Sequence, residues 1–209
     1  MPQLLQEIEP FPVSLPDGPD LLLRPLGKGD QERVRRAYAL LSPESRLNRF
    51  WEKPAEMSPS RAASLTDTDN SDHIAWVALS ASDPDFPGYA GGSFWRDRES
   101  RERAELAFTV GDEWQRSGFA TLLFSILYID GWRTGVREFF GSCRRQNIAM
   151  ADWWNSMGGT VIAEPRHFQL SLPLVSPEHF VEKISFEMPP GPRRVEAAEW
   201  IGEWLERLE

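Results

Sequence analysis

The chain has 209 residues, a formal net charge of −9 at pH 7 and 41% hydrophobic residues. This length suits one domain with an extension, and the hydrophobic share is enough for a sizeable core. The negative charge disfavours nonspecific binding to nucleic acid and suits a cationic partner. The single cysteine, Cys143, excludes an internal disulfide framework, which fits a reducing compartment.

The sequence shows no targeting or membrane pattern. Its first residues, MPQLLQEIEPFPVSLPDG, lack a basic region followed by a long apolar run, so we expect no signal peptide. No stretch approaches the ~18 consecutive apolar residues of a membrane span. We therefore expect a soluble, cytoplasmic protein that binds neither membrane nor nucleic acid.

The first half of the chain shows one strand pattern, then three helix patterns and two further strand patterns. Ser42 is a good N-cap and Pro43 suits the first position of a helix. The charged stretch RDRESRER indicates a solvated hairpin turn. The predicted elements, in order, are a strand at 20–26, helices at about 29–41, 41–51 and 58–67, and strands at 73–80 and 89–97.

The second half begins with the strand RAELAFTV at 103–110, followed by the turn WQRSGFA and an apolar helix that ends near 131–135. REFFGSC predicts a strand, QNIAMADWWNSMG a helix, and TVIAE and HFQLSLPL the last strands. MPPGP at 188–192 indicates a linker. The last predicted helix, about 194–208, would dock on the domain or on a second subunit through one apolar stripe. That stripe consists of Val195, Ala198, Ile201, Leu205 and Leu208.

The turn WQRSGFA has the chemistry of an anion site. The first backbone amides of a helix lack acceptors within the helix, and the helix dipole adds about half a positive charge there. Gly118 and Ala120 are small enough for phosphates to approach the backbone, and Arg116 adds a charged donor. We expect this turn to hold a pyrophosphate; the alternative is an ordinary strand–helix connection that uses glycine for its geometry.

This turn resembles the acyl-CoA pyrophosphate motif of the GNAT superfamily of N-acetyltransferases, Gln/Arg-x-x-Gly-x-Gly/Ala, through Gln115, Gly118 and Ala120. The later helix, with Asn147 at its start and Gly158 at its end, also resembles the family. The resemblance covers about 20–173. It implies a single-domain α/β fold with a mixed, mostly antiparallel sheet flanked by helices. We predict an N-terminal arm at 1–19, an acetyltransferase domain at 20–188, and a linker with an amphipathic C-terminal helix at 189–209.

The resemblance also implies a set of site residues and acetyl-CoA as the co-substrate. His73, His167 and His179 lack the spacing of metal ligands and Cys143 stands alone, so we expect no metal. The implied cofactor contacts are Phe108, Val110, Gln115, Arg116, Ser117, Gly118, Phe119, Ala120 and Asn147. Backbone N–H groups at 108–110 would bind the oxyanion of the tetrahedral intermediate. Many members carry a tyrosine as general acid where this chain has Trp154, so we expect no general acid.

Glu105 is the expected catalytic residue. Strand alternation places it on one face with Arg103, Ala107 and Thr109. The opposite face consists of Ala104, Leu106, Phe108 and Val110. In the family a glutamate on this strand often acts as general base, commonly through water, and removes a proton from an ammonium acceptor. The alternative is that Glu105 pairs with an arginine of the charged hairpin.

The stretch LSPESRLNRFW and the pair Ala104–Glu105 resemble Pat-type bacterial protein lysine acetyltransferases more narrowly. We therefore expect transfer to a primary amine, with protein lysine favoured over a small polyamine-like or aminoglycoside-like amine. Two further alternatives stay open: a catalytically silent CoA-binding module, and a structural domain that only resembles the fold.

Overall fold

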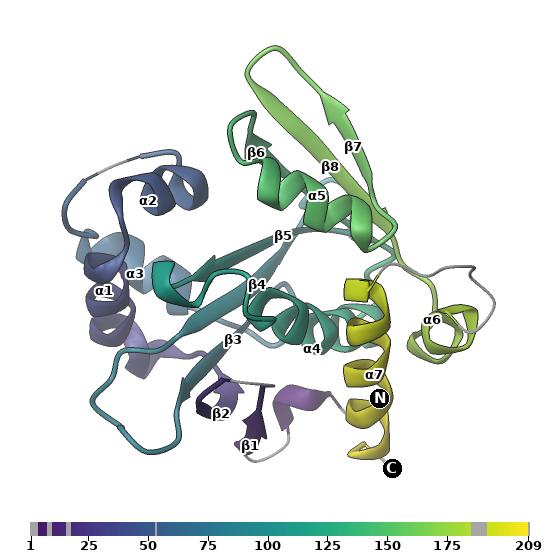
Figure 1. Ribbon diagram of the computed structural model, residues 1–209, viewed down its shortest axis with the longest axis horizontal. Helices are drawn as coiled ribbons and strands as arrows, with labels where there is room; N and C mark the ends of the chain where they lie inside the picture. Colours follow the sequence, from purple (N-terminus) through teal and green to yellow (C-terminus); the bar gives the residue numbers. More distant parts are fainter. Residues whose placement is uncertain (1–3, 8–9, 16–17, 53, 185–191, 209) are drawn as a thin grey trace. The chain divides into compact units, whose positions relative to one another are not determined.

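The computed structural model describes residues 4–7, 10–15, 18–52, 54–184 and 192–208. Within these residues, two strands are followed by three α-helices and then by three consecutive strands, and two α-helices come last (Figure 1). The strands are β1 (Phe11–Ser14), β2 (Asp20–Pro25), β3 (His73–Ser80), β4 (Ala90–Arg96), β5 (Arg103–Val110), β6 (Glu138–Arg144), β7 (Thr160–Ala163) and β8 (His167–Pro173). The α-helices are α1 (Gln31–Leu40), α2 (Pro43–Phe50), α3 (Pro59–Thr66), α4 (Phe119–Arg133), α5 (Ile148–Ser156), α6 (Pro177–Ile184) and α7 (Pro192–Glu206). The short 3-10 helices are η1 (Leu5–Glu7), η2 (Lys28–Asp30) and η3 (Asp112–Trp114).

The strands form one eight-stranded sheet in the order β1-β2-β3-β4-β5-β6-β8-β7. The pairs β1/β2, β2/β3, β6/β8 and β7/β8 are antiparallel, whereas β5 and β6 are parallel. The parallel register joins Arg103 to Glu138 and Glu105 to Phe140. The predicted fold class, a mixed and mostly antiparallel sheet with flanking helices, is confirmed.

Besides the short 3-10 helices, one strand and one α-helix were not predicted. β1 lies within the residues assigned to an N-terminal arm, and it pairs with β2 through Phe11 and Leu23. The helix α6 follows the last strand and begins at a Ser-Pro pair. The predicted linker falls almost entirely on 188–191, which lie outside the described residues.

The chain divides into two compact units. The N-terminal unit comprises Ile8–Phe94 and Ala107–Leu123, and the C-terminal unit comprises Met1–Glu7, Trp95–Leu106 and Phe124–Glu209. In the N-terminal unit every residue of β3 is buried, and α1, α2 and α3 lie together (Figure 1). Their shared buried core consists of Tyr38, Leu41, Phe50, Met57 and Ala62.

In the C-terminal unit the helix α7 docks on its own chain. Trp204 is fully buried and its indole Nε1 donates a hydrogen bond to Ser125 Oγ on α4, at 3.2 Å. The predicted apolar stripe is partly wrong. Ala198 and Ile201 are buried as expected, but Val195, Leu205 and Leu208 are only half-buried, and the remaining buried positions are Ala197 and Trp204. The buried face of α7 includes Trp204 and differs from the predicted stripe, because the large indole of Trp204 packs inside the unit, where Ser125 accepts its hydrogen bond.

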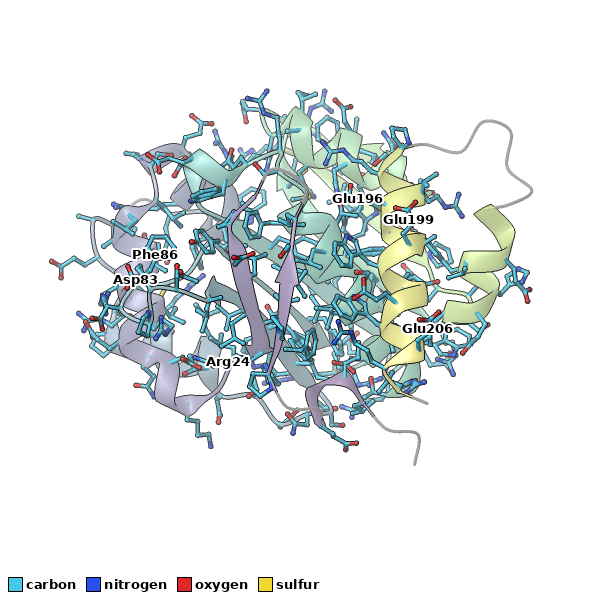
Figure 2. All side chains as sticks on the ribbon, turned by 60° about the horizontal axis from the view of Figure 1, so that its bottom comes forward. Arg24, Asp83, Phe86, Glu196, Glu199 and Glu206 are labelled. Carbon is cyan, nitrogen blue, oxygen red and sulfur yellow. The ribbon has the colours of Figure 1, made fainter. Side chains whose placement is uncertain are left out.

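Replacing Trp204 tests how much this docking stabilises the fold. Trp204→Ala removes a fully buried aromatic ring, so we expect the free energy of unfolding to fall by about 3–5 kcal/mol. Glu206→Ala is the control, since Glu206 is exposed on the same helix (Figure 2). Urea unfolding, followed by far-UV circular dichroism and not by tryptophan fluorescence, gives the free energy of unfolding of each variant. Equal midpoints for the two variants would contradict the assignment of α7 to the core.

Candidate active site

The turn between β5 and α4 has the geometry that the sequence predicts. β5 ends at Val110, η3 covers Asp112–Trp114, and α4 begins at Phe119. Gly118 has a φ of 88°, a conformation in which an L side chain is strained, and Arg116 has a φ of 68°. The amide of Leu122 donates to the Gly118 carbonyl oxygen at 2.9 Å and closes the first helical turn.

The backbone amides of this turn form a donor array. Within the described residues, the amides of 116–120 donate no hydrogen bond, as expected where a helix has just begun. Arg116 and Ser117 are exposed, and Phe119 is buried beneath them. Such an array at a helix N-terminus suits a phosphate or pyrophosphate.

Aromatic side chains hold the turn from below. Tyr89 stacks on Phe119 with ring centroids 5.7 Å apart and meets Trp114 edge to face at 4.9 Å. The Tyr89 carbonyl oxygen also accepts a hydrogen bond from the Gly111 amide at 2.9 Å. The rings of Tyr89, Trp114 and Phe119 therefore pack against one another beside the donor array.

A polar cluster joins this turn to the start of α2. We call it the Asp112 cluster; it consists of Ser42, Ser45, Asp112 and Gln115. The Asp112 carboxylate accepts from the Ser42 amide at 2.9 Å and from the hydroxyls of Ser42 and Ser45, both at 2.7 Å. Gln115 Nε2 donates to Ser45 Oγ at 3.0 Å. Partial burial opposes ionisation of Asp112, but these hydrogen bonds outweigh it and hold the pKa of Asp112 below its ordinary value.

Sequence reasoning missed this cluster. Ser42 was predicted as the N-cap of α2, and its hydroxyl does accept from the Ser45 amide at 3.2 Å. Its second role, as a donor to a carboxylate 70 residues away, has no local signature. Only the position of Asp112 shortly before Gln115 could have suggested a link to the turn.

A cavity of about 520 Å³ lies beside α1 and α2 in the N-terminal unit. Most of its lining is apolar or aromatic, including Tyr38, Phe50 and Trp76. Ala107 and Thr109 contribute from β5, and residues 111–114 contribute from the turn. The cavity therefore adjoins both β5 and the segment that leads into the donor array.

Glu105 lies on the strand face that the alternation predicts. Along β5, Ala104, Leu106 and Phe108 are buried, whereas Glu105 is exposed. Among the described residues Glu105 forms no hydrogen bond or ion pair, so the alternative of a pair with a hairpin arginine is not observed. Arg103 on the same strand pairs instead with Glu138 at 3.1 Å. Glu105 belongs to the C-terminal unit, and Ala107 and Thr109, which follow on the same strand face, to the N-terminal unit.

The helix α5 carries the residues of the second predicted motif. Asn147 is its N-cap, and the side-chain oxygen accepts from the Met150 amide at 3.3 Å. Trp154 is buried, and its indole Nε1 donates to the Ser171 carbonyl oxygen at 2.9 Å. The indole at this position is therefore held in the core, in keeping with the prediction that it is not an acid. Asn147 and the predicted contacts at 108–120 belong to different units, and their joint role stays a prediction.

Gly159 makes room for this tryptophan. A Cβ built on Gly159 would overlap the Trp154 ring and lie 2.9 Å from the Ser171 carbonyl oxygen. We expect Gly159→Ala to lower the free energy of unfolding by about 1–3 kcal/mol through overpacking. Gly202→Ala is the matched control, because a Cβ there meets nothing within 4 Å. Thermal unfolding compares them; a Gly159→Ala melting temperature equal to that of Gly202→Ala would contradict the packing role.

Cys143 is a buried thiol. Its side chain is 3% exposed, and burial raises its pKa to about 11, so it is uncharged at neutral pH. The described part of the chain contains no group of three or more histidine, cysteine, aspartate or glutamate residues that could hold a metal ion. In that same part no helix combines the length and the apolar character needed to cross a bilayer.

Two curated acetyltransferases are similar in sequence, although no family model matches the chain. Acetyltransferase Pat of Mycolicibacterium smegmatis is 31% identical over 159 residues, which are 75% of this chain and 46% of Pat. This chain thus spans about half of the length of Pat. Acetyltransferase PA5475 of Pseudomonas aeruginosa is 32% identical over 145 residues, 69% of this chain and 77% of that protein.

Solved structures share the fold. The GNAT domain of S. lividans PAT superposes with a TM-score of 0.71 at 24% identity, over 79% of this chain and 97% of that domain. The structure of yncA from Salmonella typhimurium, solved with its cofactor acetyl-CoA, gives a TM-score of 0.56 at 17% identity over 75% of this chain and 95% of yncA. Together with the identity to PA5475, these matches confirm the resemblance seen in the motifs: the chain belongs to the GNAT family of acetyltransferases.

Proposed function

We propose that this protein transfers the acetyl group of acetyl-CoA directly to a primary amine in a ternary complex. One observation carries the proposal: the residues that lead into the donor array, 111–114, also line the cavity beside α1 and α2. An anion held at the amides of 116–120 would therefore lie next to a space that can take an acceptor. The binding of acetyl-CoA by yncA, which has the same fold, supports the choice of anion.

Glu105 acts as the general base in this proposal. A lysine-like ammonium has a pKa near ~10.4 and must lose a proton before its nitrogen can attack the thioester carbonyl. Glu105 is exposed and without an ion pair among the described residues, so its carboxylate is available to accept that proton, directly or through water. The amine nitrogen then attacks the thioester carbonyl to form a tetrahedral oxyanion, and its second proton passes to water. The oxyanion collapses by breaking the C–S bond, and the sulfur leaves as a thiolate.

The remaining groups stabilise charge and position the cofactor. Backbone N–H groups at the end of β5, between Phe108 and Val110, are the proposed oxyanion donors, each of a kind typically worth a few kcal/mol. Trp154 donates to a backbone carbonyl in the core and cannot protonate the leaving thiolate. A thiol with a pKa near ~8.5 needs no such acid at neutral pH.

Protein lysine is the favoured acceptor. Leu40, at the end of α1, lines the cavity and is 67% exposed, and Trp51, just after α2, is 49% exposed. In this proposal an acceptor protein covers Leu40 beside the cavity. The sequence similarity to Pat supports the same acceptor.

A small amine is the second candidate, and the cavity is the observation that favours it. Its volume of about 520 Å³ lies within the ~300–1,000 Å³ common for small-molecule sites. The aromatic lining would suit an amine with an apolar body better than a polyamine.

A thiol-release assay decides among these functions. The protein is incubated with acetyl-CoA and either a panel of small amines or a lysine-containing protein extract, and mass spectrometry then detects acetyl-lysine. We expect acetyl-lysine above the enzyme-free control. Robust turnover of a small amine with an unmodified extract would select the second candidate. Tight CoA binding with neither activity would favour a catalytically silent CoA-binding module.

A further inference from the structure

We infer that Ser45 and Asp112 are positioning residues that couple acetyl-CoA binding to the order of α2. The inference rests on the proposed function, because it takes the turn at 115–120 as the cofactor site. It adds a link between that turn and the acceptor side of the cavity, which neither the motif nor the fold implies.

The hydrogen bonds of the Asp112 cluster form a continuous chain. Gln115, the first residue of the pyrophosphate motif, donates a hydrogen bond to Ser45 Oγ at 3.0 Å, and the Ser45 hydroxyl in turn donates one to Asp112 Oδ1 at 2.7 Å. Asp112 in turn holds both the amide and the hydroxyl of Ser42. These hydrogen bonds connect Gln115 to the first turn of α2 through Asp112 and the two serines.

The helix α3 shows that an N-cap alone does not require this chain of hydrogen bonds. Like α2, α3 begins with a serine N-cap followed by proline: Ser58 Oγ accepts from the Arg61 amide at 3.2 Å. The remaining hydrogen bond of that hydroxyl is local, to Ser60 Oγ at 3.2 Å. The two helix starts thus share a cap, but only Ser42 also donates to a residue that precedes the turn.

The cluster also belongs to the cavity wall. Ser42 and Asp112 both line the cavity, one from each side of the contact between α2 and the turn. A ligand that orders the turn would therefore also order this part of the wall. Such coupling is reciprocal. If the ligand at the turn raises the affinity for an acceptor bound at this wall, the acceptor raises the affinity for that ligand by the same factor.

The test uses the full chain with CoA as the probe. Isothermal titration calorimetry gives the dissociation constant, and amide hydrogen exchange of residues 44–50 with and without CoA reports the order of α2. For Ser45→Ala we expect the dissociation constant to rise about 3- to 10-fold, the effect of losing one or two solvent-exposed hydrogen bonds. We also expect CoA to slow exchange in α2 of the wild type but not of Ser45→Ala.

Two further variants separate coupling from stability. Ser45→Thr keeps the hydroxyl, so affinity and the exchange response should both return. Ser58→Ala removes the comparable cap of α3 and should lower the melting temperature while leaving CoA affinity and the α2 response unchanged.

Each outcome bears on the inference. If the wild type binds CoA and Ser45→Ala matches it in affinity and in exchange, the coupling is wrong and the proposed function stands. Equal loss in Ser58→Ala would also overturn the coupling, since the effect would then follow from general destabilisation. If the wild type itself does not bind CoA, both the coupling and the proposed function are wrong.

Discussion

Glu105→Gln is expected to lower the turnover number by about 10²–10⁴-fold at neutral pH, the usual contribution of a positioned general base. The amide occupies nearly the same volume but accepts no proton, and its position on an exposed strand face means that the fold should not change. Affinity for CoA should be retained. The rate should partly recover as the pH rises toward the amine pKa near ~10.4, because more of the acceptor is then already deprotonated.

Glu102→Gln is the matched control for this variant. Glu102 is also exposed, carries the same charge and lies just before β5, but it is outside the strand whose face leads to Ala107 and Thr109. Steady-state rates across the pH range, with CoA titrated by calorimetry, compare the two. Full activity of Glu105→Gln at every pH would mean that the base is another group or bulk water.

The local part of the fold could be predicted because each element carries its own pattern. β3 and β5 occur at the predicted residues, since a buried run and a strict alternation define them without reference to the rest of the chain. The N-cap of α2 was likewise predicted from Ser42 and Pro43.

The missed helix α6 shows a pattern that was present but not used. It begins with Ser176, Pro177 and Glu178, the same residues that open α2, and Ser176 Oγ accepts from the His179 amide at 3.2 Å. β1 is a different case, because its four residues include a proline and are too few to show an alternation. It is recognised as a strand only through its pairing with β2.

Only those parts of the candidate site that depend on neighbouring residues could be predicted from the sequence, whereas contacts between distant segments could not. The motif predicted the turn and the strand face of Glu105, because both depend on neighbouring residues. The Asp112 cluster joins residues 70 positions apart, and the cavity draws on α1, α2, α3, three strands and the turn. Such contacts depend on how distant segments pack, which no local pattern encodes.

Gly118→Glu is expected to abolish the rise in melting temperature that CoA produces in the wild type. A ligand present at ~100 times its dissociation constant stabilises the folded state by about 2.7 kcal/mol, and a variant that cannot bind it gains nothing. The new side chain would place bulk and negative charge against the amides of 116–120, and the φ of 88° would strain it. Gly135→Glu is the matched control: its φ of 96° imposes the same kind of strain and charge at the other end of α4, where a Cβ meets nothing within 4 Å. Both variants should melt earlier than the wild type without ligand, but only Gly135→Glu should respond to CoA in thermal shift measurements. A full response from Gly118→Glu would remove the pyrophosphate from this turn, and with it the reason to expect chemistry in the adjoining cavity.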